Sequence, residues 1–289
     1  MNRREFLKAS TGSALAAAWA GCATRPTAPR APGPRKSIML SMLPPKLPLD
    51  EKFARARRAG FEGIEITTPR EASGPSALRA AADRAGLAIH SVGCRNWGEL
   101  TDPDPRVRGT GQDELRRSLR CARAVGADVV LLVPGVVDGK TRYAEAYERS
   151  QAEIRRALPL ARELGVVIAI EEVWNDFLLS PLEFARYIDE FNSPFVRAYF
   201  DVGNVVKNGW PQDWIRTLGR RIVRVHLKDF RKMDHKFVPL LEGDVDWREV
   251  RRAFRETGFT GYMTAEFNGD DVLDPDELSR RMGKILAGK

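Results

Sequence analysis

Ile222–Asp229, with the sequence IVRVHLKD, begins as an apolar run and turns polar at its end. Short runs of β-branched residues are typical of a strand buried in a parallel sheet. His226 and Lys228 then follow where the strand ends, which is the edge at which α/β barrels place their chemistry. The segment therefore predicts a strand of a parallel sheet that carries functional side chains at its carboxyl end.

The same pattern, an apolar run followed by a helical stretch, occurs eight times along the chain. Strands are predicted at 38–42, 63–67, 88–92, 129–133, 166–171, 196–201, 222–226 and 262–266. Helices are predicted at 51–59, 76–85, 113–125, 144–164, 181–191, 211–218, 247–257 and 275–286, and Pro159 is expected to kink or split the fourth. Eight such units in about 250 residues predict an α/β fold, a single (β/α)8 TIM barrel. A doubly wound sheet is the alternative, but residues 43–48, LPPKLP, lack its glycine-rich turn.

The first 36 residues differ from the rest of the chain. Arg3 and Arg4 open the sequence RREFLK, which resembles a twin-arginine export signal, and the Ala-rich run 9–20 that follows is too short to anchor the chain in a bilayer. Cleavage after the AWA sequence at 18–20 and lipidation of Cys22 in a lipoprotein-like box both stay open. Residues 1–22 are therefore predicted to direct export by the twin-arginine route, which yields either a periplasmic protein or a lipoprotein anchored in the membrane through Cys22. Residues 23–36, with four prolines, are predicted to be a disordered tether, and residues 37–289 to be the barrel.

The net charge of +8 arises mainly in this N-terminal region. Residues 1–36 hold seven of the 47 Lys and Arg residues and one of the 39 Asp and Glu residues, which leaves 40 basic against 38 acidic side chains in the rest. A nearly neutral folded part gives no electrostatic reason to expect a nucleic-acid partner. Cys94 and Cys121 are too few for a disulfide framework and are expected to be buried thiols.

Four consecutive strands are predicted to end in a metal-ligating residue: Glu171, Asp201, His226 and Glu266. In a barrel these side chains converge on one mouth, where three carboxylates would repel each other unless a cation lay among them. The set is rich in oxygen donors, so one divalent ion is expected, with Mn²⁺, Mg²⁺ or Co²⁺ favoured over Zn²⁺.

From residue 37 to residue 286 the chain resembles the xylose-isomerase-like TIM-barrel family of sugar isomerases and epimerases. The resemblance rests on the sequences IAIE at 168–171, FDVGN at 200–204, HLKD at 226–229, GDVDW at 243–247 and AE at 265–266. It implies that Glu171, Asp201, His226 and Glu266 are the metal ligands of a ketose 3-epimerase, with Glu171 and Glu266 also as the acid–base pair. Asn204 departs from the family, which often has His at that position. The sequence EEVWN at 171–175 is unlike that of the tagatose-type epimerases of the family.

Further residues are candidates for substrate binding. Glu65 lies near the end of the second predicted strand and is interpreted as a substrate contact, as a residue supporting the site, or as part of a structural ion pair. The others lie in loops at the predicted mouth, where they could stack on or hydrogen-bond a sugar: Trp97, Trp174, Asn175, Asn204, Lys228 and Arg231. His90 is expected to be a core residue, and His235 to be solvated.

Together these features predict an enzyme that removes a proton next to the carbonyl of a small carbohydrate. The predicted function is an epimerase or isomerase, and an exported enzyme of this kind would meet sugars that carry no phosphate. The alternatives are an exported keto-sugar lyase or hydratase with the same metal site and a sugar-phosphate isomerase or epimerase. Three histidines are too few for the zinc cluster of an apurinic-site endonuclease, an activity found in a related branch. A sugar-binding lipoprotein would not need both Glu171 and Glu266. Assembly into a homo-oligomer stays open.

Overall fold

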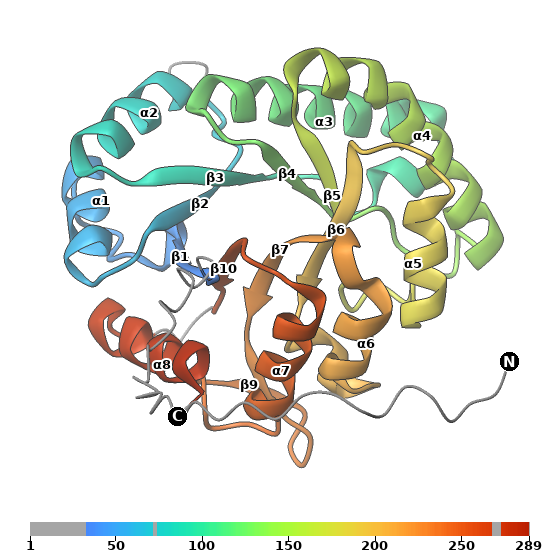
Figure 1. Cartoon of the computed structure of the whole chain (residues 1–289). Helices are drawn as coiled ribbons and strands as arrows, with labels where there is room; N and C mark the ends of the chain where they lie inside the picture. Colours follow the sequence, from blue (N-terminus) through green and yellow to red (C-terminus); the bar gives the residue numbers. More distant parts are fainter. Residues whose placement is uncertain (1–32, 72–73, 268–272, 289) are drawn as a thin grey trace, which may run out of the picture. The chain divides into compact units, whose positions relative to one another are not determined.

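The computed structural model describes residues 33–71, 74–267 and 273–288, and every statement below on the fold concerns these residues. The predicted export signal, its processing sites and residues 23–32 of the predicted tether lie outside them. Eight parallel strands form a closed barrel in the order β1-β10-β7-β6-β5-β4-β3-β2, with the helices around it (Figure 1). The predicted TIM barrel is confirmed.

The barrel strands alternate with eight α-helices in the described part of the chain. The strands are β1 (Arg35–Met39), β2 (Gly63–Thr67), β3 (Ala88–Gly93), β4 (Val129–Leu132), β5 (Val167–Glu171), β6 (Val196–Asp201), β7 (Ile222–Leu227) and β10 (Tyr262–Ala265). The helices are α1 (Leu49–Arg58), α2 (Gly74–Ala85), α3 (Pro105–Val125), α4 (Tyr143–Leu164), α5 (Pro181–Asp189), α6 (Pro211–Leu218), α7 (Trp247–Thr257) and α8 (Pro275–Ala287). Helix α4 runs without a break through Pro159, which was expected to kink or split it.

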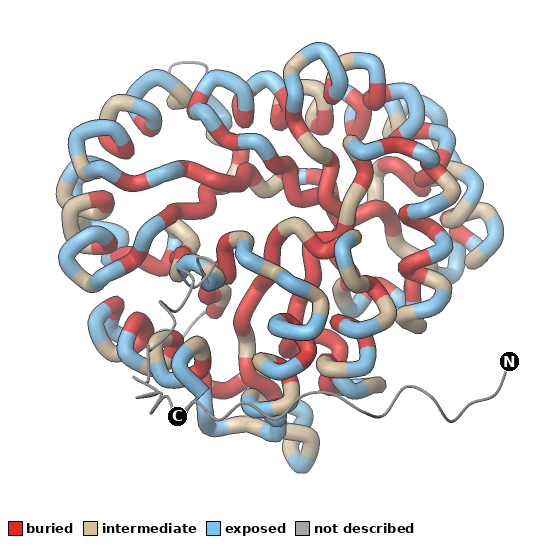
Figure 2. Tube along the Cα trace, viewed as in Figure 1, coloured by how far each residue is buried: buried red, intermediate tan, exposed pale blue. Residues whose placement is uncertain are grey.

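Alternate residues of each strand face either the barrel interior or the surrounding helices. Val129 and Leu131 of β4 pack in the interior with Ala169 and Tyr199, whereas the intervening Val130 belongs to the larger core that the helices share. Buried strands and exposed outer helix faces alternate accordingly along the chain (Figure 2). Since residues two apart share a face, the positions after Ala169 and Tyr199 on that face are Glu171 and Asp201. The pleat alone therefore directs both carboxylates inward.

The first strand begins earlier than predicted. It covers Arg35–Met39, and residues 40–42 form a 3-10 turn instead of the end of the strand. Arg35 pairs in register with Tyr262 and donates a hydrogen bond to its hydroxyl at 2.9 Å, while Lys36 Nζ donates to Ser279 Oγ at 2.7 Å. These long polar side chains have partners on the barrel, so the folded unit begins before residue 37 and the predicted tether is too long.

Helix α3 is also longer than predicted, because it begins at Pro105 instead of residue 113. Asp104 caps it by accepting a hydrogen bond from the backbone N–H of Arg106 at 2.8 Å. The added turns contain Gly109 and Gly111, which weaken a helical pattern in the sequence. Gly111 is buried against the segment at Glu99, where a Cβ would lie 2.9 Å from the Glu99 side chain, so tertiary contact accounts for this part of the helix.

A short antiparallel hairpin, β8 (Asp229–Arg231) and β9 (Lys236–Val238), follows β7 and was not predicted. The buried carboxylate of Asp229 holds this region together. Its Oδ2 accepts hydrogen bonds from the backbone N–H of Leu241 and from Nε1–H of Trp247, both at 2.9 Å, and its Oδ1 accepts from the backbone N–H of Val245 at 3.3 Å. Asp229 thus fixes the segment after the hairpin to the carboxyl end of the barrel.

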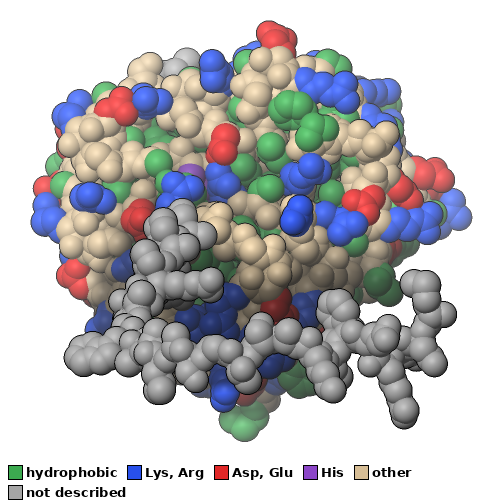
Figure 3. Space-filling model, viewed as in Figure 1, with side chains coloured by type: hydrophobic (Ala, Val, Ile, Leu, Met, Phe, Trp, Pro, Cys, Tyr) green, Lys and Arg blue, Asp and Glu red, His purple; other side chains and the backbone are tan. Residues whose placement is uncertain are grey.

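The surface carries charges of both signs. On the face shown in Figure 3, Lys and Arg side chains are interspersed with Asp and Glu side chains over the helices. Cys94 and Cys121 are buried and unpaired, as expected, and burial raises the pKa of both thiols to about 11. Within the described residues, no helix combines the length and the apolar character that crossing a membrane requires.

Candidate metal centre and active site

The four predicted ligands come together at the carboxyl ends of four neighbouring strands. Glu171 and Asp201 end β5 and β6, His226 lies near the end of β7, and Glu266 directly follows β10. Each offers one donor atom, and the four donor atoms lie within 4.8 Å of one another. The convergence follows from the strand order, because β5, β6, β7 and β10 are adjacent in the closed sheet.

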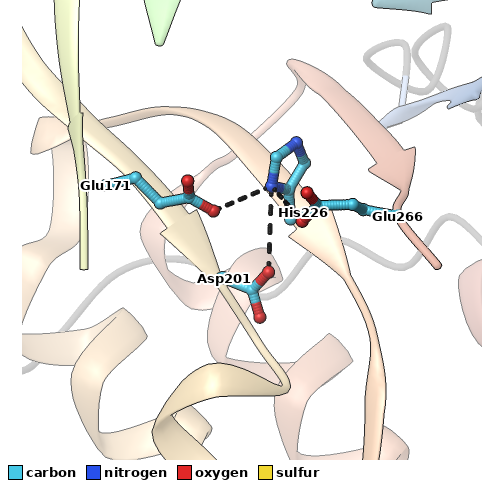
Figure 4. Close-up of side chains that lie close together, drawn as sticks. All are labelled: Glu171, Asp201, His226 and Glu266. Carbon is cyan, nitrogen blue, oxygen red and sulfur yellow. Dashed lines mark hydrogen bonds and ion pairs between the residues drawn. The ribbon is translucent and has the colours of Figure 1, made fainter. Parts of the chain in front are cut away.

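His226 lies at the centre of this cluster (Figure 4). Its Nδ1 atom is 2.9 Å from Glu171 Oε1, 2.9 Å from Glu266 Oε2 and 3.8 Å from Asp201 Oδ2. Glu171 and Glu266 approach the imidazole from opposite sides (Figure 4). All four side chains are at least four-fifths buried.

Glu65 and Tyr199 orient the histidine from behind. The other imidazole nitrogen, Nε2, lies 3.2 Å from both carboxylate oxygens of Glu65. Tyr199 donates its hydroxyl hydrogen to the same carboxylate, and its ring centre lies 4.5 Å from that of His226. A donor bond from Nε2–H to Glu65 turns Nδ1 toward the three carboxylates, so that in the neutral ring the lone pair of Nδ1 would be placed to ligate a metal ion.

Asp201 is held in a comparable way. Its Oδ1 accepts a hydrogen bond from the backbone N–H of Asn204 at 2.7 Å, and its own backbone N–H donates to Glu172 Oε1 at 2.8 Å. The side-chain amide of Asn204 donates to the backbone carbonyl oxygen of Glu172 at 3.0 Å, so Asp201, Asn204 and Glu172 are linked to one another by hydrogen bonds. Only Oδ2 of Asp201 is left to face the centre of the cluster.

Burial and neighbouring charges shift the pKa values of Glu171 and Glu266 in opposite directions. Burial raises the pKa of Glu171 to about 7, although His226 opposes the shift. Burial also acts to raise the pKa of Glu266, but the positive charges of His226 and Lys228 outweigh it and lower that pKa well below its ordinary value. Burial would lower the pKa of His226, yet Glu266, Glu65 and further neighbours raise it well above the usual range. One glutamate therefore holds a proton more readily than the other.

The chemistry of the donor set fits a divalent cation. Asp201 Oδ2 and Glu266 Oε2 are buried and accept no directional hydrogen bond, although the ammonium of Lys228 lies within ion-pair distance of both. Buried carboxylate oxygens require a positively charged partner, and in this structure that partner is the ammonium of Lys228. Three carboxylates and one imidazole match hard or borderline ions such as Mn²⁺, Mg²⁺ and Co²⁺.

The other predicted substrate residues have different surroundings. Glu65 is buried and directed at His226, and Lys228 is directed at Asp201 and Glu266 instead of pairing with Asp229. The amide of Asn175 donates to Gly135 O at 2.6 Å, so that this side chain, like that of Asn204, has a backbone partner.

The aromatic and basic candidates are more exposed. Trp174 is 43% exposed, stacks on Phe237 of the hairpin with ring centres 4.9 Å apart, and donates from Nε1 to Asn204 O at 2.9 Å. Trp97, in the loop after β3, is 60% exposed. Arg231 forms an ion pair with Asp234 at 2.8 Å.

The two remaining histidines lie as predicted. His90 is buried between Ser37 Oγ, 2.7 Å from its Nε2, and Arg224, which donates to its Nδ1 at 3.1 Å. Burial lowers its pKa well below the ordinary value. His235 is exposed in the turn of the hairpin, with a left-handed φ of 53°.

Sequence reasoning missed Tyr199 and Glu172 as parts of the site. Tyr199 stands two residues before Asp201 and therefore shares its face of the strand, a spacing that could have identified it. Glu172 directly follows Glu171, but only the structure shows that its carboxylate is turned to the backbone of Asp201.

Comparisons with known proteins agree with this geometry. Residues 53–286 match the family described as xylose isomerase-like TIM barrel. The L-ribulose-5-phosphate 3-epimerase UlaE of Escherichia coli O1:K1 / APEC is 27% identical over 179 residues, which are 61% of this chain and 62% of that protein. The match thus spans about three fifths of the length of this curated relative.

Solved structures with the same fold include 3-epimerases and a 3-epimerase-like protein. A D-tagatose 3-epimerase-like protein superimposes with a TM-score of 0.76 at 18% identity, over 88% of this chain and 98% of that chain. A D-allulose 3-epimerase from Methylomonas sp. in complex with D-allulose gives 0.74 at 19% identity, over 89% and 97%. With the barrel and its ligand cluster in place, the family match over 53–286 decides the assignment: this chain belongs to the xylose isomerase-like TIM barrel family.

Proposed function

We propose that this chain is a metal-dependent epimerase of a small sugar that carries no phosphate. The observation that carries the proposal is the placement of Glu171 and Glu266 on opposite sides of His226 Nδ1, each 2.9 Å from it (Figure 4). Two carboxylates on opposite sides of a substrate can exchange protons with both faces of one carbon. The similarity to 3-epimerases supports the same reaction class.

The metal centre is proposed to consist of Glu171, Asp201, His226 and Glu266, with Mn²⁺, Mg²⁺ or Co²⁺ favoured over Zn²⁺. A bound divalent ion would stabilise the negative charge that develops on the carbonyl oxygen when the neighbouring carbon loses its proton. The chain contributes the remaining steps. One glutamate takes the proton from the carbon next to the carbonyl, and the other delivers a proton to the opposite face, which inverts that carbon.

The residues around the mouth are proposed to bind the sugar. Trp97 and Trp174 offer aromatic surface, and Lys228 and Arg231 offer donors for hydroxyl oxygens. Asn175 and Asn204 are proposed to act mainly by holding the loops, since their amides donate to backbone carbonyls. Glu65 is proposed to act through His226 instead of by direct contact with the sugar.

A sugar phosphate is the second candidate substrate. The curated relative with 27% identity is a 3-epimerase of L-ribulose 5-phosphate. The positive charges that a phosphate group needs could come from Lys207 and Lys232. These lysines lie in the segments after β6 and β8, with their ammonium groups over the rings of Trp174 and Trp210. The free sugar is favoured because an exported enzyme would meet few phosphorylated metabolites, and the D-allulose complex of a structural neighbour contains a free sugar.

The test uses the Mn²⁺-loaded protein with free ketoses, keto-glycosides and sugar phosphates in D₂O. We expect deuterium to enter the carbon next to the carbonyl, with kcat/KM higher for a free sugar than for its phosphate. A preferred phosphate ester would contradict the substrate class but not the reaction. Loss of a β-substituent, seen by mass spectrometry, would instead identify a lyase on the same site.

Export is proposed on the sequence alone, since residues 1–22 lie outside the described part of the chain. Replacement of Arg3 and Arg4 by lysine is expected to abolish export of the full-length chain in a twin-arginine-competent host, measured by fractionation. Replacement of Cys22 by serine then distinguishes a lipid anchor from a cleaved signal, because it releases only a lipoprotein from the membrane. Undiminished export of the double-lysine variant would contradict the proposal.

A further inference from the structure

The ammonium of Lys228 lies on the same oxygen atoms that face the proposed metal position. Lys228 follows β7, and its Nζ is 3.0 Å from Asp201 Oδ2 and 2.6 Å from Glu266 Oε2. The same two oxygens lie 3.8 Å and 2.9 Å from His226 Nδ1. A divalent ion bound by the four ligands would therefore need two oxygens that Lys228 already contacts.

The charges make this overlap consequential. Glu171, Asp201 and Glu266 place three carboxylates within one buried cluster. Such a cluster is stable only if positive charge compensates it. Lys228 is the lysine that the structure places within ion-pair distance of two of them, and its side chain is 14% exposed. The singly charged ammonium of Lys228 and a divalent ion beside the same oxygens would repel each other strongly at this burial.

We propose that Lys228 is an internal counter-ion that is exchanged for the metal ion. Its ammonium balances the ligand carboxylates and leaves Asp201 Oδ2 and Glu266 Oε2 when a divalent ion binds. The inference rests on the proposed metal centre at Glu171, Asp201, His226 and Glu266. It adds that metal affinity is set by a competitor within the chain, not by the ligands alone.

The surroundings provide a place for the displaced ammonium. Lys228 Nζ lies 5.4 Å from the ring centre of Phe237 in β9, which is within the range of a cation–π contact. On exchange the ammonium would keep this contact, which it already makes, and would move from the two carboxylate oxygens toward the hairpin at the mouth of the barrel. There it would face the sugar as a donor to an oxygen, which links metal loading to completion of the substrate site.

The competition has a measurable size. If Lys228 is displaced in only about one-tenth to one-hundredth of the molecules, the apparent affinity for metal is about 10- to 100-fold weaker than the intrinsic affinity. Lys228→Met removes the charge and keeps the apolar stem. We expect this variant to bind Mn²⁺ at least about 10-fold more tightly than the wild type, measured by isothermal titration calorimetry. Without added metal its Tm should be lower, because the carboxylates lose their counter-ion.

Lys284→Met is the matched control, since Lys284 is exposed on α8. It should leave both Mn²⁺ affinity and Tm unchanged. Labelling of lysines with acetic anhydride, followed by peptide mass spectrometry, tests the wild-type protein directly. Lys228 should be slow to react without metal and should react several-fold faster once Mn²⁺ is bound, whereas the rate at Lys284 should stay the same.

The outcomes separate the two proposals. Equal or weaker Mn²⁺ binding by Lys228→Met, or labelling of Lys228 that does not respond to Mn²⁺, overturns the exchange while the metal centre stands. If Lys228→Met binds Mn²⁺ and the wild type does not, the exchange is supported, and the ammonium of Lys228 then outcompetes the metal ion in the wild type. Absence of Mn²⁺ binding by both proteins removes the metal centre and the exchange with it. If Lys228→Met does not fold, the labelling of the wild-type chain decides.

Discussion

Glu171→Gln and Glu266→Gln are each expected to lower kcat by about 10²- to 10⁴-fold at saturating Mn²⁺, the range that general acid–base catalysis supplies. Each glutamine keeps the shape of the side chain and one oxygen donor, but it cannot take up or release a proton. The loss should therefore exceed what weaker metal binding explains. Because the two residues lie on opposite sides of His226, each variant should stop exchange at one face of the substrate carbon.

The measurement combines steady-state rates, Mn²⁺ affinity and deuterium incorporation for each variant. Glu163→Gln is the control, since Glu163 is exposed on α4, and it should retain wild-type rates. Residual exchange of solvent deuterium without formation of the epimer would identify which glutamate serves which starting sugar. Full activity of either active-site variant would contradict the proposed acid–base roles.

Glu65→Gln is expected to weaken Mn²⁺ binding by about 10- to 100-fold, although Glu65 is not itself a proposed ligand. The carboxylate receives the Nε2–H of His226 and the hydroxyl hydrogen of Tyr199. A neutral amide accepts these hydrogen bonds less strongly, so the orientation and basicity of Nδ1 should both suffer. Tyr199→Phe removes one donor to Glu65 and should cause a smaller loss in the same direction.

Calorimetric titration with Mn²⁺ distinguishes this role from direct contact with the sugar. A residue that orients His226 should change Mn²⁺ affinity in the absence of sugar. A residue that only binds sugar should raise KM and leave Mn²⁺ affinity unchanged, and that result for Glu65→Gln would refute the orienting role. Glu148→Gln, at an exposed position of α4, is the matched control.

The eight strand–helix units could be identified from the sequence because hydrophobic periodicity is a local property. β2 and β6 begin and end where the apolar runs predict. The ligand set could also be predicted, since the carboxyl ends of parallel strands share one edge and side chains two apart share one face. Glu171 and Asp201 required no information beyond the fold and the pleat.

Elements that depend on tertiary contacts were misjudged or missed. Arg35 and Lys36 look like part of a polar tether, and only Tyr262 and Ser279, more than 220 residues away in sequence, make them part of β1. The hairpin β8–β9 contains six residues in its two strands, too few for a clear periodic pattern. Its position depends on the four N–H groups that meet the carboxylate of Asp229.

The sequence by itself therefore determined the barrel and the residues at its mouth, whereas the tertiary structure decided what each of them faces. Glu65 and His226 are 161 positions apart in the chain, and only closure of the barrel brings their side chains within 3.2 Å. Lys228 could have paired with its neighbour Asp229, but the pleat turns adjacent side chains to opposite faces. Lys228 is thereby directed at Asp201 and Glu266. The sequence could not show these partners, because direction and distance across a closed sheet are not encoded in local spacing.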